Sequence, residues 1–194
     1  MQIEETSKSQ ICQGDIYRGI IYHEYAIETD DIIEISQIVF PAAVVLTQEC
    51  DLFQDYTYRS GGERHTNDKL LLSVLMAPVY NFDHFIKGQH LSELGLTMEK
   101  ISSDPKRLIV SNQNARYHYL DFPDSARLPS SVIDFKHYFS VTVRNLTDLK
   151  DLNFICRVSP LFREDISQRF ANFLSRIGLP ELCQGKDCGV QPDT

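Results

Sequence analysis

Residues 40–52 read FPAAVVLTQECDL, and the change within them from apolar to polar side chains is the feature on which the fold is predicted. The segment 43–46 is short, rich in β-branched residues and preceded by Pro41, which is typical of a strand buried on both faces. Pro41 suits the first residue of such a strand, where the ladder needs no backbone N–H. Residues 47–51 then follow where the strand leaves the core, and loops at strand ends are common places for chemistry.

Composition describes an ordinary globular chain. Of its 194 residues, 42% are hydrophobic and 24% are charged, and this length suffices for one domain with a sizeable core. The formal net charge is −8. Basic residues that contact phosphates supply much of the affinity for nucleic acid, so an acidic chain is less expected to contain a long RNA-binding groove. Its charge is better suited to a basic protein partner.

Cysteine usage and hydropathy indicate a cytoplasmic location. The number of cysteines is odd and their spacing forms no framework, as expected for free thiols in a reducing compartment. They are Cys12, Cys50, Cys156, Cys183 and Cys188. The first residues show no basic segment followed by an apolar one, and no apolar run reaches the length of a membrane span, so we expect neither a signal peptide nor a membrane association.

The remaining pattern predicts several short strands, a helical interruption and one long helix. Strands are expected within 14–22, 33–39, 70–76, 108–110, 116–120 and 137–143. The polar stretch 51–68 is predicted to be a mobile loop, and 81–106 to hold two short helices.

A final helix is predicted over 160–177. Pro160 suits its first position, and Ser159 precedes it as a potential cap. An apolar face recurs at helical spacing and should cover one side of the sheet. Its members are Phe162, Ile166, Phe170, Phe173, Leu174 and Ile177.

These elements predict an α+β fold. We expect a small SH3-like β-barrel or a strongly bent antiparallel sheet, with a helical insertion near 80–106 and a C-terminal helix. Residues 1–180 would form a single domain, and 181–194, which are rich in glycine, proline and polar residues, would form a flexible tail.

Three short blocks resemble the PemK/MazF-like toxin barrel. They are Gly14-Asp15-Ile16, the apolar strand from Pro41 to Thr47, and Leu128-Pro129-Ser130-Ser131-Val132-Ile133-Asp134. The resemblance implies a bacterial origin and an SH3-like barrel, and members of that family studied as toxins are dimeric ribonucleases. A homodimer is therefore expected.

The resemblance also implies site residues. In that family, an arginine directly before the proline and a Ser or Thr at the end of the next strand carry RNA cleavage. Here Thr47 matches the hydroxyl position, but Phe40 occupies the arginine position. If the chain cleaves RNA, Glu49 or Asp51 would act as base, and Arg64 or a neighbouring arginine would supply the cation.

Further candidates come from the residues themselves. Cys50 beside Asp51 could serve as a nucleophile, or could join Asp51 and His65 in a zinc site, although we expect neither a metal nor a cofactor. For binding RNA, aromatic residues next to cations are suitable, because they can stack on bases and meet phosphates. The expected binding residues are Arg18, Arg59, His65, Arg116 and His118.

The leading functional expectation is a divergent, toxin-like or defence-associated barrel that engages RNA or a protein partner near Thr47, Cys50 and Asp51. One alternative is a non-catalytic protein-binding module of a multi-component bacterial system. Another is a thiol or zinc enzyme centred on Cys50.

Overall fold

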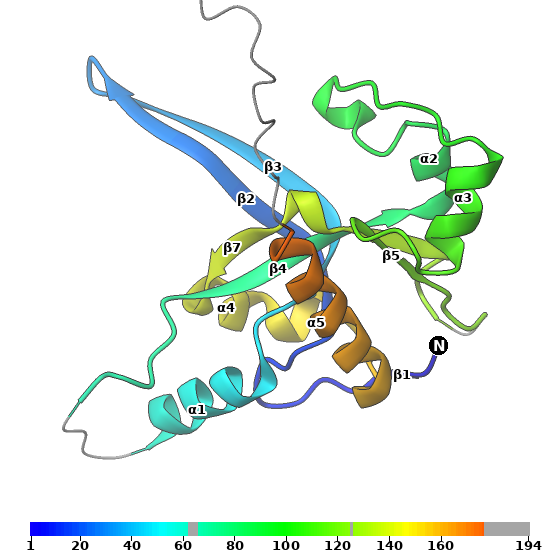
Figure 1. Cartoon of the computed structure of the whole chain (residues 1–194). Coiled ribbons are helices and arrows are strands. Elements are labelled where there is room, and N and C mark those ends of the chain that lie inside the picture. Colours follow the sequence, from blue (N-terminus) through cyan, green and yellow to red (C-terminus); the bar gives the residue numbers. More distant parts are fainter. Residues whose placement is uncertain (62–65, 125, 177–194) are drawn as a thin grey trace, which may run out of the picture.

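The computed structural model describes residues 1–61, 66–124 and 126–176, and it confirms the predicted α+β fold (Figure 1). The strands are β1 (Ile3–Glu4), β2 (Asp15–Thr29), β3 (Ile32–Val45), β4 (Ser73–Asn81), β5 (Tyr117–Leu120), β6 (Ser131–Asp134), β7 (Phe139–Thr142) and β8 (Phe154–Val158). The helices are α1 (Glu49–Ser60), α2 (Phe82–Ile86), η1 (Ser92–Leu94), α3 (Ser103–Val110), η2 (Phe135–His137), α4 (Val143–Asn153) and α5 (Pro160–Leu174).

The strands form one strongly curled antiparallel sheet, a half-barrel. Its order is β1-β8-β2-β3-β4-β6-β5, and β7 pairs with β4 beside β6. Strand β8 therefore lies between β1 and β2, although its residues come much later in the chain. α2, η1 and α3 lie together on one side of the molecule, drawn in green in Figure 1.

Strand β4 pairs with three different strands along its length. Residues 73–76 pair with β7, 76–78 with β3, and 79–81 with β6. Pro78 lies inside β4 and has no N–H, so it cannot complete a ladder bond at that point. Between β6 and β7, η2 takes the place of a continuous strand. The prediction that this strand lies within 70–76 was wrong at its end: β4 continues to Asn81, because proline is tolerated where the neighbouring ladder is interrupted.

Strands β2 and β3 form a long hairpin that projects from the body of the molecule (Figure 1). The turn is made by Asp30 and Asp31, both with positive φ (51° and 63°), as a tight hairpin turn requires. The strands bond to the rest of the sheet only near the base, at 15–17 in β2 and at 43–45 in β3. We call residues 19–39 the arm.

Alternation in the central strands divides the core between two faces of the sheet. Ile16, Val44 and Ala77 point to the face covered by α5, and Tyr17 and Met76 to the opposite face, which α4 covers. A third cluster joins Phe82, Phe85 and Ile109 of the helical insertion to Tyr80 and Val132 of the sheet.

The Gly14-Asp15 turn carries a buried ion pair. The Asp15 carboxylate lies 2.6 Å from Arg157 Nε of β8, and both side chains are almost fully buried. The same carboxylate accepts hydrogen bonds from the backbone N–H of Cys12 and from the Tyr17 hydroxyl. Because a buried charge must be paired, this turn fixes the start of β2 against β8.

The C-terminal helix is confirmed, and α5 buries Ile166, Phe170 and Phe173 against the sheet. The helix ends at Leu174, earlier than predicted. The side chain of Leu174 is 51% exposed, so its expected place on the buried face was wrong. Ser159 precedes Pro160 but makes no side-chain capping bond. Ile177 and the predicted tail 181–194 lie outside the described residues.

Two other predictions were wrong, and two further elements had not been predicted. Residues 49–60 form helix α1 and not a loop, since the buried Leu52 and Asp55 share one side of it. Residues 108–110 are the last turn of α3, which buries only Ile109. Residues 143–158 form α4 and β8, which the sequence pattern had not suggested.

No helix within the described residues is long and apolar enough to cross a membrane.

Candidate functional site

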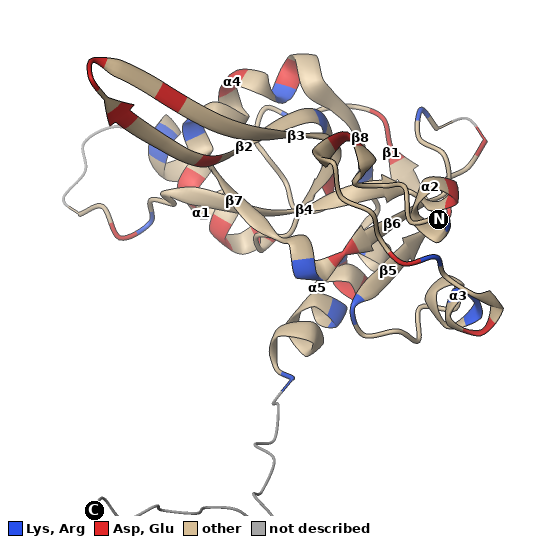
Figure 2. Ribbon diagram, turned by 90° about the horizontal axis from the view of Figure 1, so that it is seen from above, with Lys and Arg blue, Asp and Glu red and all other residues tan. Residues whose placement is uncertain are grey.

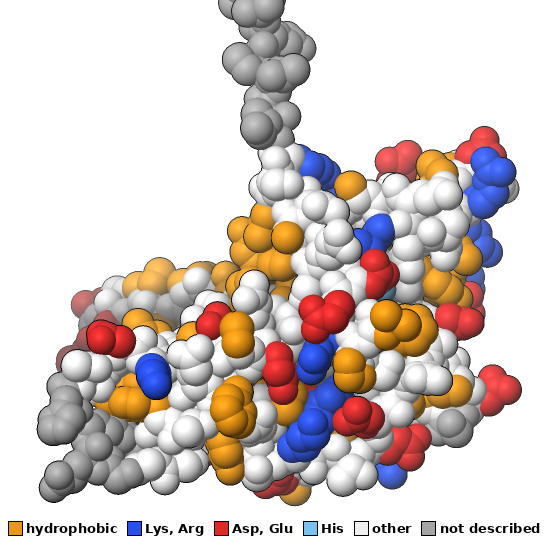
Figure 3. Space-filling view, turned by 60° about the horizontal axis from the view of Figure 1, so that its bottom comes forward, with side chains coloured by type: hydrophobic (Ala, Val, Ile, Leu, Met, Phe, Trp, Pro, Cys, Tyr) orange, Lys and Arg blue, Asp and Glu red, His pale blue; other side chains and the backbone are white. Residues whose placement is uncertain are grey.

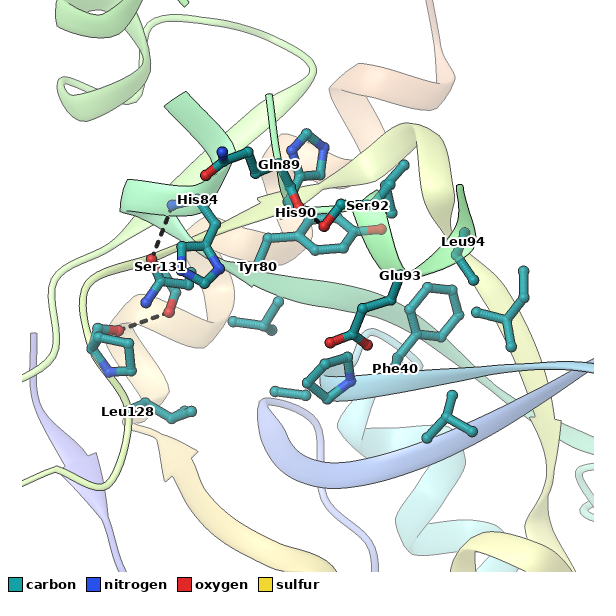
Figure 4. Close-up of a pocket in the computed structure, with 18 residues that line it drawn as sticks. Phe40, Tyr80, His84, Gln89, His90, Ser92, Glu93, Leu94, Leu128 and Ser131 are labelled. Atoms are coloured by element: carbon teal, nitrogen blue, oxygen red, sulfur yellow. Dashed lines mark hydrogen bonds between the residues drawn. The ribbon is translucent and has the colours of Figure 1, made fainter. Parts of the chain in front are cut away.

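A cavity of about 450 Å³ lies between the base of the arm and the helical insertion (Figure 4). Its size is within the range typical of ligand sites, roughly 300–1,000 Å³. The lining comes from β3, β4, α2, the segment 89–94 and the segment before β6. The lining residues are Ile38, Val39, Phe40, Pro41, Ala42, Val79, Tyr80, Asn81, His84, Gln89, His90, Leu91, Ser92, Glu93, Leu94, Leu128, Pro129 and Ser131.

The cavity forms because β3 and β4 separate beyond their short ladder at 43–45 and 76–78. The residues of β3 that precede the ladder belong to the arm. The residues of β4 that follow the ladder pair with β6, and the chain then continues directly into α2. The Asn81 side chain caps α2 by accepting hydrogen bonds from the N–H groups of Asp83 and His84. This cap holds His84 at the cavity wall.

The segment that carries Glu93 is shaped by a glycine. Gly88 has a φ of +71°, and a Cβ atom there would overlap the backbone carbonyl of Met98. Only glycine therefore allows residues 88–98 to fold back on themselves. The backbone N–H of Met98 donates to the Gly88 carbonyl at 3.2 Å and closes this segment.

Polar side chains reach the cavity from opposite walls. In Figure 4, His84 and the carboxylate of Glu93 extend toward its centre from different sides. Glu93 has no ion pair and no side-chain hydrogen bond within the described part of the chain. His90 packs against the rings of Tyr80 and Phe85, at 4.8 Å between centroids in each case.

The ring nitrogens of His90 are buried, and neither has a hydrogen-bond partner among the residues described. Burial lowers the pKa of His90 to about 4, so the imidazole is neutral near pH 7. A neutral imidazole offers one acceptor and one donor nitrogen. A buried polar group without a partner is uncommon in proteins.

Behind the cavity lies a charged network. Arg116 binds the fully buried carboxylate of Asp134 with two nitrogens, at 2.8 and 2.5 Å. His137 Nδ1 lies 3.4 Å from the same carboxylate and 3.1 Å from the Tyr80 hydroxyl. Burial and the Asp134 charge raise the pKa of Tyr80 above its ordinary value. Arg116, expected to bind RNA, is thus committed to an internal ion pair.

The predicted catalytic group at 47–51 lies at the start of α1, on the other side of the β3–β4 ladder. The Thr47 hydroxyl oxygen accepts a hydrogen bond from the backbone N–H of Leu75 at 2.7 Å. Glu49 accepts one from the Gln13 N–H at 2.8 Å and pairs with Arg163 at 3.3 Å. These contacts give both residues a role in holding the fold.

Cys50 and Asp51 are exposed in the first turn of α1. The Cys50 thiol lies 3.6 Å from a side-chain oxygen of Gln48 and 3.6 Å from one of Asp51. The described residues contain no group of three His, Cys, Asp or Glu side chains that could hold a metal ion. Arg64 and His65 lie outside the described residues.

The other predicted binding residues do not come together. Arg18 donates to the carbonyl of Leu152, and Arg59 pairs with Asp55 at 2.8 Å. His118 is buried on β5, 3.9 Å from Asp165 of α5. On the face drawn in Figure 3, basic side chains lie between acidic ones, so that face carries no continuous basic stripe for a nucleic-acid backbone.

The arm is the second unusual surface. Seven of its large apolar side chains are exposed, with Ile32 at 69% and Ile33 at 66%. The set is Ile21, Tyr25, Ile27, Ile32, Ile33, Ile35 and Val39. The arm also carries five carboxylates and no lysine or arginine. They are Glu24, Glu28, Asp30, Asp31 and Glu34, and Figure 2 shows acidic positions in red along the ribbon of the arm to its tip.

Comparison of the chain with protein-family models, curated proteins and solved structures gave no match. The resemblance to the PemK/MazF-like barrel stays a prediction. Sequence reasoning missed the cavity residues Glu93 and His90, because no spacing marks them. For the arm a signal existed: isoleucines interleaved with acidic residues over 27–35, without the strict alternation of a half-buried strand.

Proposed function

We propose that this chain is a protein-binding module, and that its arm docks on a partner protein whose apolar surface is rimmed by lysine or arginine. The observation that carries the proposal is the exposed apolar ribbon bordered by five carboxylates and no cation. Exposed contiguous apolar surface on a folded protein marks interaction sites.

The pairing of the arm supports the same conclusion. Within the described residues, strands β2 and β3 pair only with each other over 19–39. A two-stranded ribbon alone is marginally stable in water, and a long edge with apolar side chains is a template for further pairing. A partner would bury the isoleucines and would use the free edges.

Charge selects the class of partner. Nucleic acid would be repelled by the five carboxylates, and a second arm would bring like charges into contact. A protein with cations around an apolar surface satisfies both properties of the arm. RNA cleavage has less support from the geometry, because Thr47 and Glu49 are engaged in internal contacts.

Site-specific cross-linking tests the proposal. A photoreactive phenylalanine analogue is placed at Ile33 and, as a control, at Leu152, which is 75% exposed and lies on α4. In cells that make the protein, irradiation should give one defined adduct from position 33 and none from position 152. Peptide sequencing of the adduct should locate the contact in a basic, apolar segment.

A charge variant completes the test. Glu24→Lys, Glu28→Lys and Glu34→Lys combined should reduce the affinity of the purified partner at least about tenfold. Combined Asp68→Lys, Asp124→Lys and Asp148→Lys, at exposed positions off the arm, should leave it unchanged. An adduct between two copies of the chain, an acidic contact segment or equal affinity of the two variants would refute the proposal.

A further inference from the structure

The cavity at the base of the arm is acidic. Glu93 is the only acidic side chain among the described residues that line it, and neither lysine nor arginine is among them. The Glu93 side chain is exposed to solvent at the edge of the cavity, so its carboxylate is hydrated and open to a ligand. A cation or a strong hydrogen-bond donor would complement it.

Two histidines also line the same space. His84 reaches into the cavity opposite Glu93 (Figure 4), and the His90 ring lies in the cavity wall. Acceptors in several directions fit a guanidinium, which has five N–H donors in a rigid fork, better than an ammonium, which is a compact and strongly hydrated charge.

The walls suit the stem of such a side chain. Phe40, Pro41, Val79, Leu91 and Leu128 present apolar surface around the polar groups. An arginine side chain has this composition, with three methylene groups that pack on apolar surface and a charged end that seeks a carboxylate.

The cavity is continuous with the arm, because Ile38 and Val39 belong to the arm and also line the cavity. We infer that the cavity binds an arginine side chain of the protein that docks on the arm. The inference rests on the proposed function, and it specifies one anchor residue of the partner. The Glu93 carboxylate binds the guanidinium, and the His84 imidazole accepts from one of its remaining N–H groups.

Capped amino acids test the cavity without the partner. N-acetyl-arginine methylamide is titrated against the full chain while the imidazole carbon–proton signals of His84 and His90 are followed by NMR. These two signals should shift and saturate. The citrulline analogue has the same shape without the charge and should bind about tenfold more weakly or worse. The lysine analogue should be intermediate.

Two variants locate the binding. Glu93→Gln should weaken the arginine probe about tenfold, whereas Glu99→Gln, at an exposed position outside the lining, should leave binding unchanged. Equal binding of the arginine and citrulline probes, or equal binding by the two variants, would overturn the inference.

The cross-linked partner separates this inference from the proposed function. Glu93→Gln should leave the adduct at position 33 intact but lower the affinity for the purified partner. Replacement of one arginine in the partner's contact segment should lower the affinity equally. The two changes together should lower it no further than either one alone. If the adduct persists while neither change matters, the cavity inference fails alone. If the probe binds but no arginine of the partner contributes, the cavity takes a free guanidino compound, and the assignment to the partner is wrong.

Discussion

Replacing His118 by phenylalanine should flatten the dependence of stability on pH, because it removes a buried group whose protonation opposes folding. His118 is 2% exposed on β5. Burial and the nearby Arg169 guanidinium lower its pKa to about 3. Asp165 lies 3.9 Å away, but its side chain is 51% exposed and solvated, so it offsets little of this effect.

The magnitude follows from the difference between the folded and unfolded states. An unfolded histidine has a pKa of about 6.5, so between about pH 6.5 and pH 3 the unfolded chain binds a proton that the folded chain does not. The contribution of His118 is complete above about pH 6.5 and is lost as the pH falls. The loss approaches about 1.4 kcal/mol per pH unit and amounts to about 3 kcal/mol at pH 4, a large part of a typical stability of about 5–15 kcal/mol.

Urea unfolding followed by circular dichroism, at several pH values between about 4.5 and 7.5, measures this slope. Other groups also titrate, so the decisive quantity is the difference in slope between wild type and His118→Phe. Phe135→Leu is the matched control, since it loosens the packing beside His118 without changing a titratable group. Parallel curves for wild type and His118→Phe would refute the assignment of the buried neutral imidazole.

Two further predictions concern the cavity and its support. Gly88→Ala should lower the free energy of unfolding by about 2 kcal/mol or more in urea, because φ is positive and the new Cβ would meet the Met98 carbonyl. Gly95→Ala, also at positive φ but in open space, should lower it by about 1 kcal/mol. Equal losses would contradict the close approach at Gly88. Asp134→Ala leaves the half-buried Arg116 unpaired and should cost about 3–5 kcal/mol in the same assay, so a loss below about 1 kcal/mol would show that the ion pair is dispensable.

The parts of the fold that the sequence predicted correctly are those in which local pattern and tertiary role agree. The β-branched run within 43–46 is buried on both faces, and the aromatic stripe of α5 covers the sheet. α1 was missed because its apolar content is low. It is held instead by Asp55, whose carboxylate accepts a hydrogen bond from the Leu71 N–H and pairs with Arg59 one turn later.

The candidate site was less predictable than the fold. Thr47, Glu49 and Arg116 are polar residues of the kind that active sites use, yet each makes a structural contact that no sequence pattern specifies. The cavity depends on the separation of β3 from β4, which is a tertiary property. His84 and Glu93 become neighbours of one space only because the chain folds back at Gly88.

The position of β8 has a consequence for synthesis of the chain. Since β8 lies between β1 and β2, the sheet cannot close until residue 158 has left the ribosome, although β2 and β3 can pair as soon as residue 45 has emerged. Pairing between such distant segments is intrinsically slow. Throughout that interval the nascent chain carries an apolar hairpin with free edges, which is the kind of intermediate that aggregates or needs a chaperone. The five carboxylates of the arm oppose such aggregation, because they repel the same hairpin on other nascent chains translated from the same mRNA.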